Sequence, residues 1–86
     1  MINLLKNQSN TIYSFLTSYT GVAPYTFRMV NNIDRNQNES FVLTLAQFGE
    51  RVQYDILPTK MLGTYDYTIT DTNGKEVEIG LAEITE

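Results

Sequence analysis

Carboxylates are the side chains with the greatest chemical potential in this 86-residue sequence, because it contains no histidine and no cysteine. The commonest pairs of nucleophile and base therefore cannot form, and two neighbouring carboxyl groups are the remaining candidates for general acid–base catalysis. Asp66, Glu76 and Glu78 alternate with apolar residues, which places them on the solvent-facing side of two predicted strands. On a flat, hydrated sheet nothing tunes one carboxyl group against another. The sequence therefore predicts a solvated acidic face, no catalytic residue and no enzymatic activity.

The most polar segment of the chain contains the beginning of a metal-binding pattern. Asp34, Asn36 and Asn38 have the spacing with which a calcium-binding loop begins. The pattern then fails, since such a loop needs glycine at its sixth position and a bidentate glutamate at its twelfth. This chain has Glu39 and Leu45 at those positions. We expect a solvated loop here, with no metal or other cofactor.

The formal net charge of the chain is −4, and it is unevenly distributed. Residues 1–35 carry a net charge of +2, whereas residues 36–86 carry −6. An acidic chain without a basic patch is not typical of proteins that bind nucleic acid. No stretch has the apolar length of a membrane span or the pattern of a basic-then-apolar leader, so we expect no membrane partner. The absence of cysteine fits a reducing compartment.

The elements that position these residues include a β-hairpin predicted in residues 61–83. Apolar and polar residues alternate in two runs, and Asn73-Gly74 between them favours a tight reversal, because both residues tolerate a positive φ. The residues expected to face the core are Tyr65, Tyr67, Ile69, Val77, Ile79 and Leu81. Strict alternation would later bury a glutamate, so we predict a bulge at Gly80 that corrects the register.

Five further strands are predicted from alternation and from the turn residues between them. They lie within residues 1–10, 11–18, 25–30, 40–46 and 51–57. The second of these is apolar on both faces, one of which carries Tyr13 and Phe15, so it is either covered on both sides or meets another subunit. Residues 47–50 are expected to form a turn. The sequence thus predicts an all-β fold, a seven-stranded antiparallel immunoglobulin-like β-sandwich with residues 1–86 in a single domain.

Three aromatic residues have expected places in that sandwich. Phe27 is predicted at the centre of the core, at the position on the third strand where immunoglobulin domains carry tryptophan. The spacing Gly63-x-Tyr65-x-Tyr67 has the form of a tyrosine corner. In that motif Tyr65 would bond back to the backbone and Tyr67 would fill the core position two residues later. Two ordinary core tyrosines are the alternative interpretation.

The opening M-I-N-L-L-K-N-Q-S-N-T-I and the closing G-T-Y-D-Y-T-I-T-D-T-N-G-K-E-V-E-I-G-L-A-E-I resemble a group of small virion proteins of tailed bacteriophages. The middle segments Y-T-F-R-M-V-N-N and F-V-L-T-L are similar to their third and fourth strands. The resemblance implies an immunoglobulin-like sandwich that serves as a capsid accessory or decoration protein, or as part of a head fibre or tail. It implies no catalytic residues. The shortness of the chain favours the capsid surface or the connector, in a virion assembled in the cytoplasm of the bacterial host.

Binding to the major capsid protein or to other virion proteins is therefore the leading functional hypothesis, with a homo-oligomer as a further possibility. The first strand, with apolar residues on both faces, is expected to add to the sheet of a partner. The residues predicted to contact the partner are Ile2, Leu4, Leu5, Tyr19 and Val22. The alternative interpretation of the first strand is an ordinary edge strand of the sandwich.

Two other functions stay open at this point. A carbohydrate- or receptor-binding module of a phage fibre or tail would use exposed tyrosines such as Tyr19 or Tyr25. An inhibitor that coats a host enzyme would use the acidic C-terminal half as a mimic of an anionic ligand, and its binding would weaken with salt.

Overall fold

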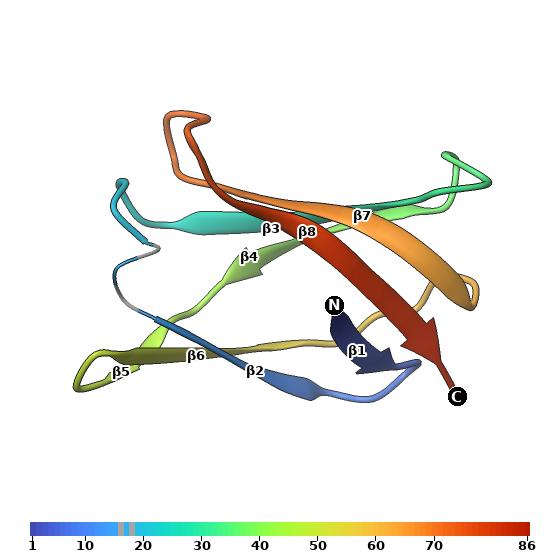
Figure 1. Ribbon diagram of the computed structural model, residues 1–86, viewed down its shortest axis with the longest axis horizontal. Coiled ribbons are helices and arrows are strands. Elements are labelled where there is room, and N and C mark those ends of the chain that lie inside the picture. Colours follow the sequence, from blue (N-terminus) through green and yellow to red (C-terminus); the bar gives the residue numbers. More distant parts are fainter. Residues whose placement is uncertain (16, 18) are drawn as a thin grey trace.

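The described residues form eight β-strands arranged in two layers (Figure 1). The computed structural model describes residues 1–15, 17 and 19–86. The strands are β1 (Ile2–Leu5), β2 (Asn10–Phe15), β3 (Tyr25–Asn31), β4 (Asn38–Leu43), β5 (Ala46–Phe48), β6 (Arg51–Ile56), β7 (Gly63–Thr70) and β8 (Glu76–Thr85). The predicted second strand includes residues 16 and 18, which lie outside the described residues.

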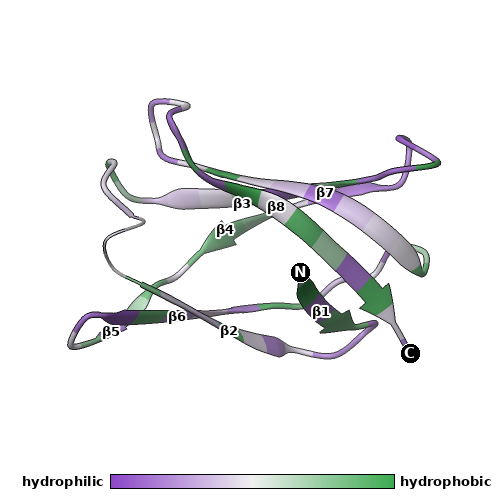
Figure 2. Ribbon diagram, in the orientation of Figure 1, coloured by the Kyte–Doolittle hydropathy of each residue, from purple (hydrophilic) through white to green (hydrophobic). Residues whose placement is uncertain are grey.

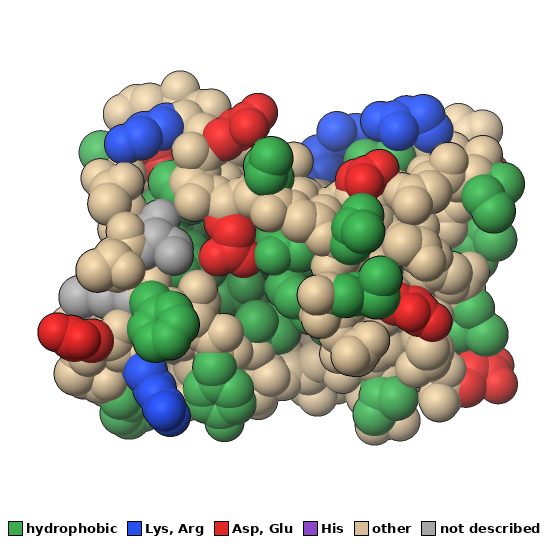
Figure 3. All heavy atoms as spheres, viewed as in Figure 1, with side chains coloured by type: hydrophobic (Ala, Val, Ile, Leu, Met, Phe, Trp, Pro, Cys, Tyr) green, Lys and Arg blue, Asp and Glu red, His purple; other side chains and the backbone are tan. Residues whose placement is uncertain are grey.

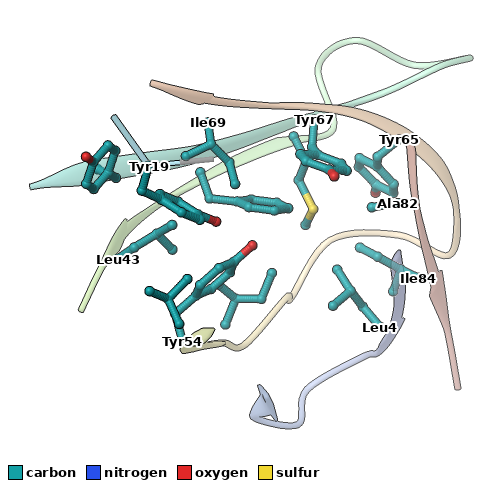
Figure 4. Close-up of a cluster of buried hydrophobic side chains, with 14 residues drawn as sticks. Leu4, Tyr19, Leu43, Tyr54, Tyr65, Tyr67, Ile69, Ala82 and Ile84 are labelled. Atoms are coloured by element: carbon teal, nitrogen blue, oxygen red, sulfur yellow. The ribbon is translucent and has the colours of Figure 1, made fainter. Parts of the chain in front are cut away.

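The two layers are sheets of unequal size that bury one face each against the other. The larger sheet has the strand order β1-β8-β7-β3-β4, and the smaller has the order β2-β6-β5. Figure 2 shows that β8 carries both hydrophobic and hydrophilic residues along its length. The core between the layers (Figure 4) includes Phe27, Tyr65, Ile69, Val52, Tyr54 and Ile56. The fold is thus all-β and sandwich-like.

The structure has one strand more than predicted, because the chain leaves the larger sheet after β4 and forms the short strand β5 in the smaller sheet. β4 ends at Leu43, and the next strand belongs to the smaller sheet. The predicted turn at residues 47–50 is wrong for Gln47 and Phe48, which are the last residues of β5. Gly49 has a φ of 62°, a left-handed conformation that costs glycine little, so a two-residue turn joins β5 to β6. A three-residue strand is too short for alternation to reveal it.

β1 runs parallel to β8, so the larger sheet is mixed and not purely antiparallel as predicted. The pairing begins with Ile2 and Ala82 and ends with Leu5 and Thr85. Asn10, at the start of β2, fixes the end of β1. Its Oδ1 accepts a hydrogen bond from Leu5 N at 2.9 Å, and its Nδ2 donates to Leu5 O at 3.0 Å. Alternation indicates which face a side chain occupies and carries no information about strand direction.

A bulge in β8 reverses which of its side chains face the core. Val77 has no partner on β7, although the residues before and after it do. Beyond this point Glu78 and the even-numbered residues share the inner face, while Ile79 is 67% exposed and Leu81 is 42% exposed. The predicted bulge at Gly80 is therefore wrong, and so are the predicted burial of Ile79 and Leu81 and the solvated position of Glu78.

The predicted burial of Phe27, Tyr65 and Tyr67 in the core is confirmed. Tyr65 is fully buried, and its hydroxyl donates a hydrogen bond to Met61 O at 2.7 Å, which is the backbone contact of a tyrosine corner. The Tyr67 ring stacks on the fully buried Phe27 ring, with centroids 4.9 Å apart and an interplanar angle of 10°. The first contact joins the start of β7 to the segment before it, and the second packs the middle of β7 against β3.

Candidate functional site

Two of the five residues predicted to contact a partner belong to the core. Leu4 is fully buried, and Tyr19 is 7% exposed. Ile2 is half-buried against the core, whereas Leu5 and Val22 are exposed. Leu4 and Tyr19 are therefore not available to a partner of the folded chain. β1 turns Leu4 toward the interior of the molecule, and the ring of Tyr19, which precedes β3, packs against Tyr25.

The two exposed members of that set do not form one surface. Leu5 pairs with Thr85 at the end of β8. The carbonyl of Val22 accepts a hydrogen bond from Thr72 N at 2.9 Å, in the loop that precedes β8. The two residues thus lie at opposite ends of the hairpin. β1 itself is held by β8 and is an edge strand of its own sheet, which was the alternative interpretation of this segment.

Tyr19 and Tyr25 do not form an exposed platform for a sugar. Tyr25 is 4% exposed, and its hydroxyl donates to Gly21 O at 3.0 Å. Its ring packs edge-on against Tyr19, with centroids 5.1 Å apart. The burial of both rings counts against carbohydrate binding through these two residues.

The outer face of the smaller sheet carries a different group of aromatic rings. Tyr13, Phe15 and Phe48 are 66%, 67% and 63% exposed. Arg51 of β6 pairs with Phe15 of β2 on one side and with Phe48 of β5 on the other. Paired residues point to the same side of a sheet, so the three form one row, and Tyr13 stands in the adjacent row. We call Tyr13, Phe15, Phe48 and Arg51 the aromatic face.

The aromatic face is large enough to be the centre of an interface. Figure 3 shows hydrophobic side chains beside a basic side chain on the part of the surface where β2, β5 and β6 lie. Two shallow hollows there, of about 270 and 200 Å³, share Tyr13 and Arg51 in their walls. Three rings exposed to this extent present roughly 300–500 Å² of apolar surface. That is as much as the largest patch of a typical monomer, and such patches often bind partners.

The sequence signal for this face was partial. The apolar character of both faces of the second predicted strand indicated either a covered strand or contact with another subunit, and the structure leaves Tyr13 and Phe15 exposed. Phe48 was missed because it was expected in a turn. Arg51 could be assigned to a strand, but its position between Phe15 and Phe48 depends on pairings that alternation does not specify.

A second cluster, of hydroxyl groups around Glu78, lies between the sheets. Tyr67 donates a hydrogen bond to Glu78 Oε2 at 2.7 Å, and Ser14 of β2 donates to Oε1 at 3.3 Å. Burial, with a further contribution from Glu78, raises the pKa of the Tyr67 hydroxyl, so it stays protonated and serves as a donor. The hydroxyls of Tyr19 and Tyr54 are buried without a hydrogen bond to any described residue. Burial likewise raises the pKa of Tyr54.

Removing the hydroxyl from Tyr54 and removing it from Tyr67 are expected to have different effects on stability. Tyr54→Phe removes a buried hydroxyl that makes no hydrogen bond to any described residue, so it should leave the free energy of unfolding unchanged or raise it by up to about 1 kcal/mol. Tyr67→Phe deprives the half-buried carboxylate of Glu78 of the closer of its two donors and should cost about 1.5–3 kcal/mol. Urea unfolding of both variants measures the difference. Equal losses in the two would contradict the assigned hydrogen bond.

Asp71 anchors the loops at the other end of the hairpin. It is 7% exposed, and its carboxylate accepts hydrogen bonds from the backbone amides of Val22, Asn73 and Lys75 at 3.0, 2.9 and 2.8 Å. These bonds, that of Val22 first, lower the pKa of Asp71. The carboxylate therefore joins the 71–75 turn to the loop before β3, and nothing in the sequence pattern distinguished it from other turn residues.

Acid is expected to weaken the fold partly through Asp71. A carboxylate whose pKa is lower in the folded chain contributes stability above its unfolded pKa of about 3.9, and that contribution is lost as the pH falls through the folded value. Asp71→Asn should therefore be less stable than the wild type at pH 7, and the difference should shrink toward pH 2. Thermal unfolding at several pH values tests this. The matched exposed variant Asp66→Asn should show no comparable loss at pH 7.

Asp34 and Asn38 of the calcium-like pattern form hydrogen bonds within their own loop. Asp34 Oδ1 accepts a hydrogen bond from Asn36 N at 3.1 Å, and Asn38 Nδ2 donates to Arg35 O at 3.0 Å. Among the described residues no group of three or more acidic side chains is placed to hold a metal ion. In the same part of the chain, no helix is long and apolar enough to cross a membrane.

Comparison with known proteins adds no relative, since the chain matches no family model and no curated protein shows significant similarity to it. The fold and the surface together define a class: a small all-β protein of two packed sheets, with an exposed aromatic face on the smaller sheet.

Proposed function

We propose that this protein is a structural component of a tailed-bacteriophage virion, an immunoglobulin-like accessory or decoration protein that binds the major capsid protein through its aromatic face. The observation that carries the proposal is the exposure of Tyr13, Phe15 and Phe48 on one face of the smaller sheet. Exposed aromatic rings beside an arginine are the residue types that dominate binding energy at protein interfaces. A patch of roughly 300–500 Å² is about half of what each partner contributes to a standard interface.

The resemblance in the opening and closing segments supports a virion role. The tyrosine corner of Tyr65 and the packing of Tyr67 on Phe27 support the immunoglobulin-like character of the sandwich. Under this proposal the protein is assembled with the particle in the bacterial cytoplasm, and the capsid surface or the connector is its place.

Purified virions provide the test. Mass spectrometry of the particles should detect this chain, and its absence from them would end the virion proposal. For the binding face, particles lacking the protein are incubated with the purified wild type or with a Phe15→Ser/Phe48→Ser variant, and bound protein is measured after sedimentation. The double variant should lose at least about 100-fold in affinity, because two aromatic contacts are removed.

A matched control keeps the binding test specific. Val42→Ser removes an apolar side chain that is 73% exposed on β4 of the larger sheet, and this variant should bind particles as the wild type does. Both variants change only exposed positions, so circular dichroism should confirm that each is folded. Equal binding by the double variant and the wild type would rule out the aromatic face as the contact surface.

Carbohydrate binding is a second candidate, because rings on a flat sheet face can stack on sugar rings. Tyr13, Arg51 and Gln53 line one of the shallow hollows and would supply hydrogen-bonding groups. A glycan array should then give signals that are lost in Tyr13→Ala. An array without signals would leave protein binding as the function of the face.

A further inference from the structure

The row Phe15–Arg51–Phe48 contains an arginine whose charge is not balanced by the described residues. No ion pair or hydrogen bond to its guanidinium is formed within the described part of the chain. Glu50, the residue before it, belongs to the β5–β6 turn and forms no ion pair with it. Asp55 lies on the same face of β6, but its carboxylate accepts the hydroxyl hydrogen bond of Thr11.

The surroundings of Arg51 favour a carboxylate as its partner. The flanking rings of Phe15 and Phe48 offer the guanidinium no hydrogen-bond acceptor, and they displace water when a second surface closes over them. A carboxylate brought to this position would form a charge-assisted, bidentate pair in a partly desolvated setting. The chain as a whole is acidic, with ten acidic residues and six cations, and Arg51 forms a local positive site within it.

A second copy of the chain is a poor occupant of the same face. Arg51 lies in the middle of its row, so two copies related by a two-fold axis through this row would bring arginine close to arginine. Like charges placed together in an interface repel each other and disfavour such a pairing. A sugar also fits less well, because two of the three rings are phenylalanine, which cannot hydrogen-bond to hydroxyl groups.

We infer that the partner of the aromatic face is a different protein whose contact surface presents a carboxylate between apolar side chains, and that this carboxylate pairs with Arg51. The inference rests on the proposed function for the location of the binding face, and it adds the chemistry of the surface that is recognised. Arg51 then selects the partner by charge, while Phe15 and Phe48 supply the apolar contact area.

The experiment uses the full chain and arrayed peptides of fixed design, in which a central residue is flanked on both sides by leucine or phenylalanine. The central residue is glutamate, glutamine or lysine in three otherwise identical sets. The wild type should bind the glutamate set about 10-fold more tightly than the glutamine set and bind the lysine set least. Arg51→Gln should abolish this preference, and Arg51→Glu should reverse it in favour of lysine.

Two results would overturn the inference. One is binding by the wild type without preference for glutamate, or no binding to any of the three sets. The other is a dimer in analytical ultracentrifugation that Arg51→Glu stabilises or Phe15→Ser dissociates, because the occupant would then be a second copy. Failure of the virion proposal is a separate outcome: it appears as absence from particles, and it leaves the peptide preference unchanged.

Discussion

Replacing Leu4 by alanine is expected to lower the free energy of unfolding by about 2–5 kcal/mol, whereas the same change at the neighbouring Leu5 should cost less than about 1 kcal/mol. Leu4 is fully buried between the sheets, and Leu5 is 41% exposed. A truncated Leu4 leaves a cavity that the surrounding rings and backbone fill only in part. An 86-residue chain has a total stability of about 4–13 kcal/mol, so the loss is a large share of it.

Urea unfolding followed by far-ultraviolet circular dichroism measures both variants. The comparison decides whether β1 is a core strand or an arm that binds a partner. Equal, small effects of Leu4→Ala and Leu5→Ala on the isolated protein would mean that β1 contributes little to the fold and is available for docking. A large effect of Leu4→Ala alone agrees with its burial.

Replacing Gly80 by valine is expected to cost about 3 kcal/mol, because Gly80 lies directly against the ring of Tyr67. A β-carbon at this position would be 2.9 Å from both Cε1 and the hydroxyl oxygen of Tyr67, closer than van der Waals contact allows. The ring cannot easily retreat, since it stacks on Phe27 and donates a hydrogen bond to Glu78. Overpacking of a core that cannot relax costs about 1–3 kcal/mol, and the branched side chain of valine places the expected loss at the upper end.

Thermal and urea unfolding of Gly80→Val test this, with Ile79→Val as the matched control on the exposed side of the same strand. The control should change stability by less than about 0.5 kcal/mol. A Gly80→Val protein as stable as the wild type would show that β8 can shift relative to β7 at this point, and that the contact with Tyr67 is not restrictive.

The all-β fold and much of the core could be predicted because alternation is a local property of the sequence. Phe27, Tyr65 and Tyr67 lie in strands long enough to show the pattern, and each is buried as predicted. The reversal near Gly74 was also identified, since only a few residue types tolerate the positive φ of 84° found there. The glycine of β8 was identified as exceptional, but for the wrong reason: it makes room for Tyr67 and does not form a bulge.

The remaining errors concern relations between strands. The bulge at Val77 shifts the register by one residue and moves Glu78 from the solvent to the inner face, where it meets Ser14 of the other sheet. The direction of β1 and the change of sheet after Leu43 depend on partners distant in sequence. The carboxylate of Asp71 joins two separate loops by accepting hydrogen bonds from their backbone amides. None of these relations can be predicted from the local alternation of apolar and polar residues.

Part of the aromatic face could be predicted from the sequence, and the rest of it depends on how the strands pair. Tyr13 and Phe15 could be noticed from the sequence because their strand is apolar on both faces. Leu4 was predicted to contact a partner because its strand is apolar on both faces, and Tyr19 because it lies in a loop, but the core requires apolar and aromatic residues as much as an interface does. Phe48 and Arg51 join the face only through the pairing of β5 with β6.

The parallel pairing of β1 with the last residues of β8 has a mechanical consequence. A force that pulls the two ends of the chain apart acts along both strands in opposite directions and loads their inter-strand hydrogen bonds in shear. Bonds loaded in shear must break together, whereas bonds at the end of a hairpin open one after another. The two terminal strands are therefore paired in a geometry that resists stretching, and extension from the chain ends requires rupture of the contact between residues 2–5 and residues 82–85.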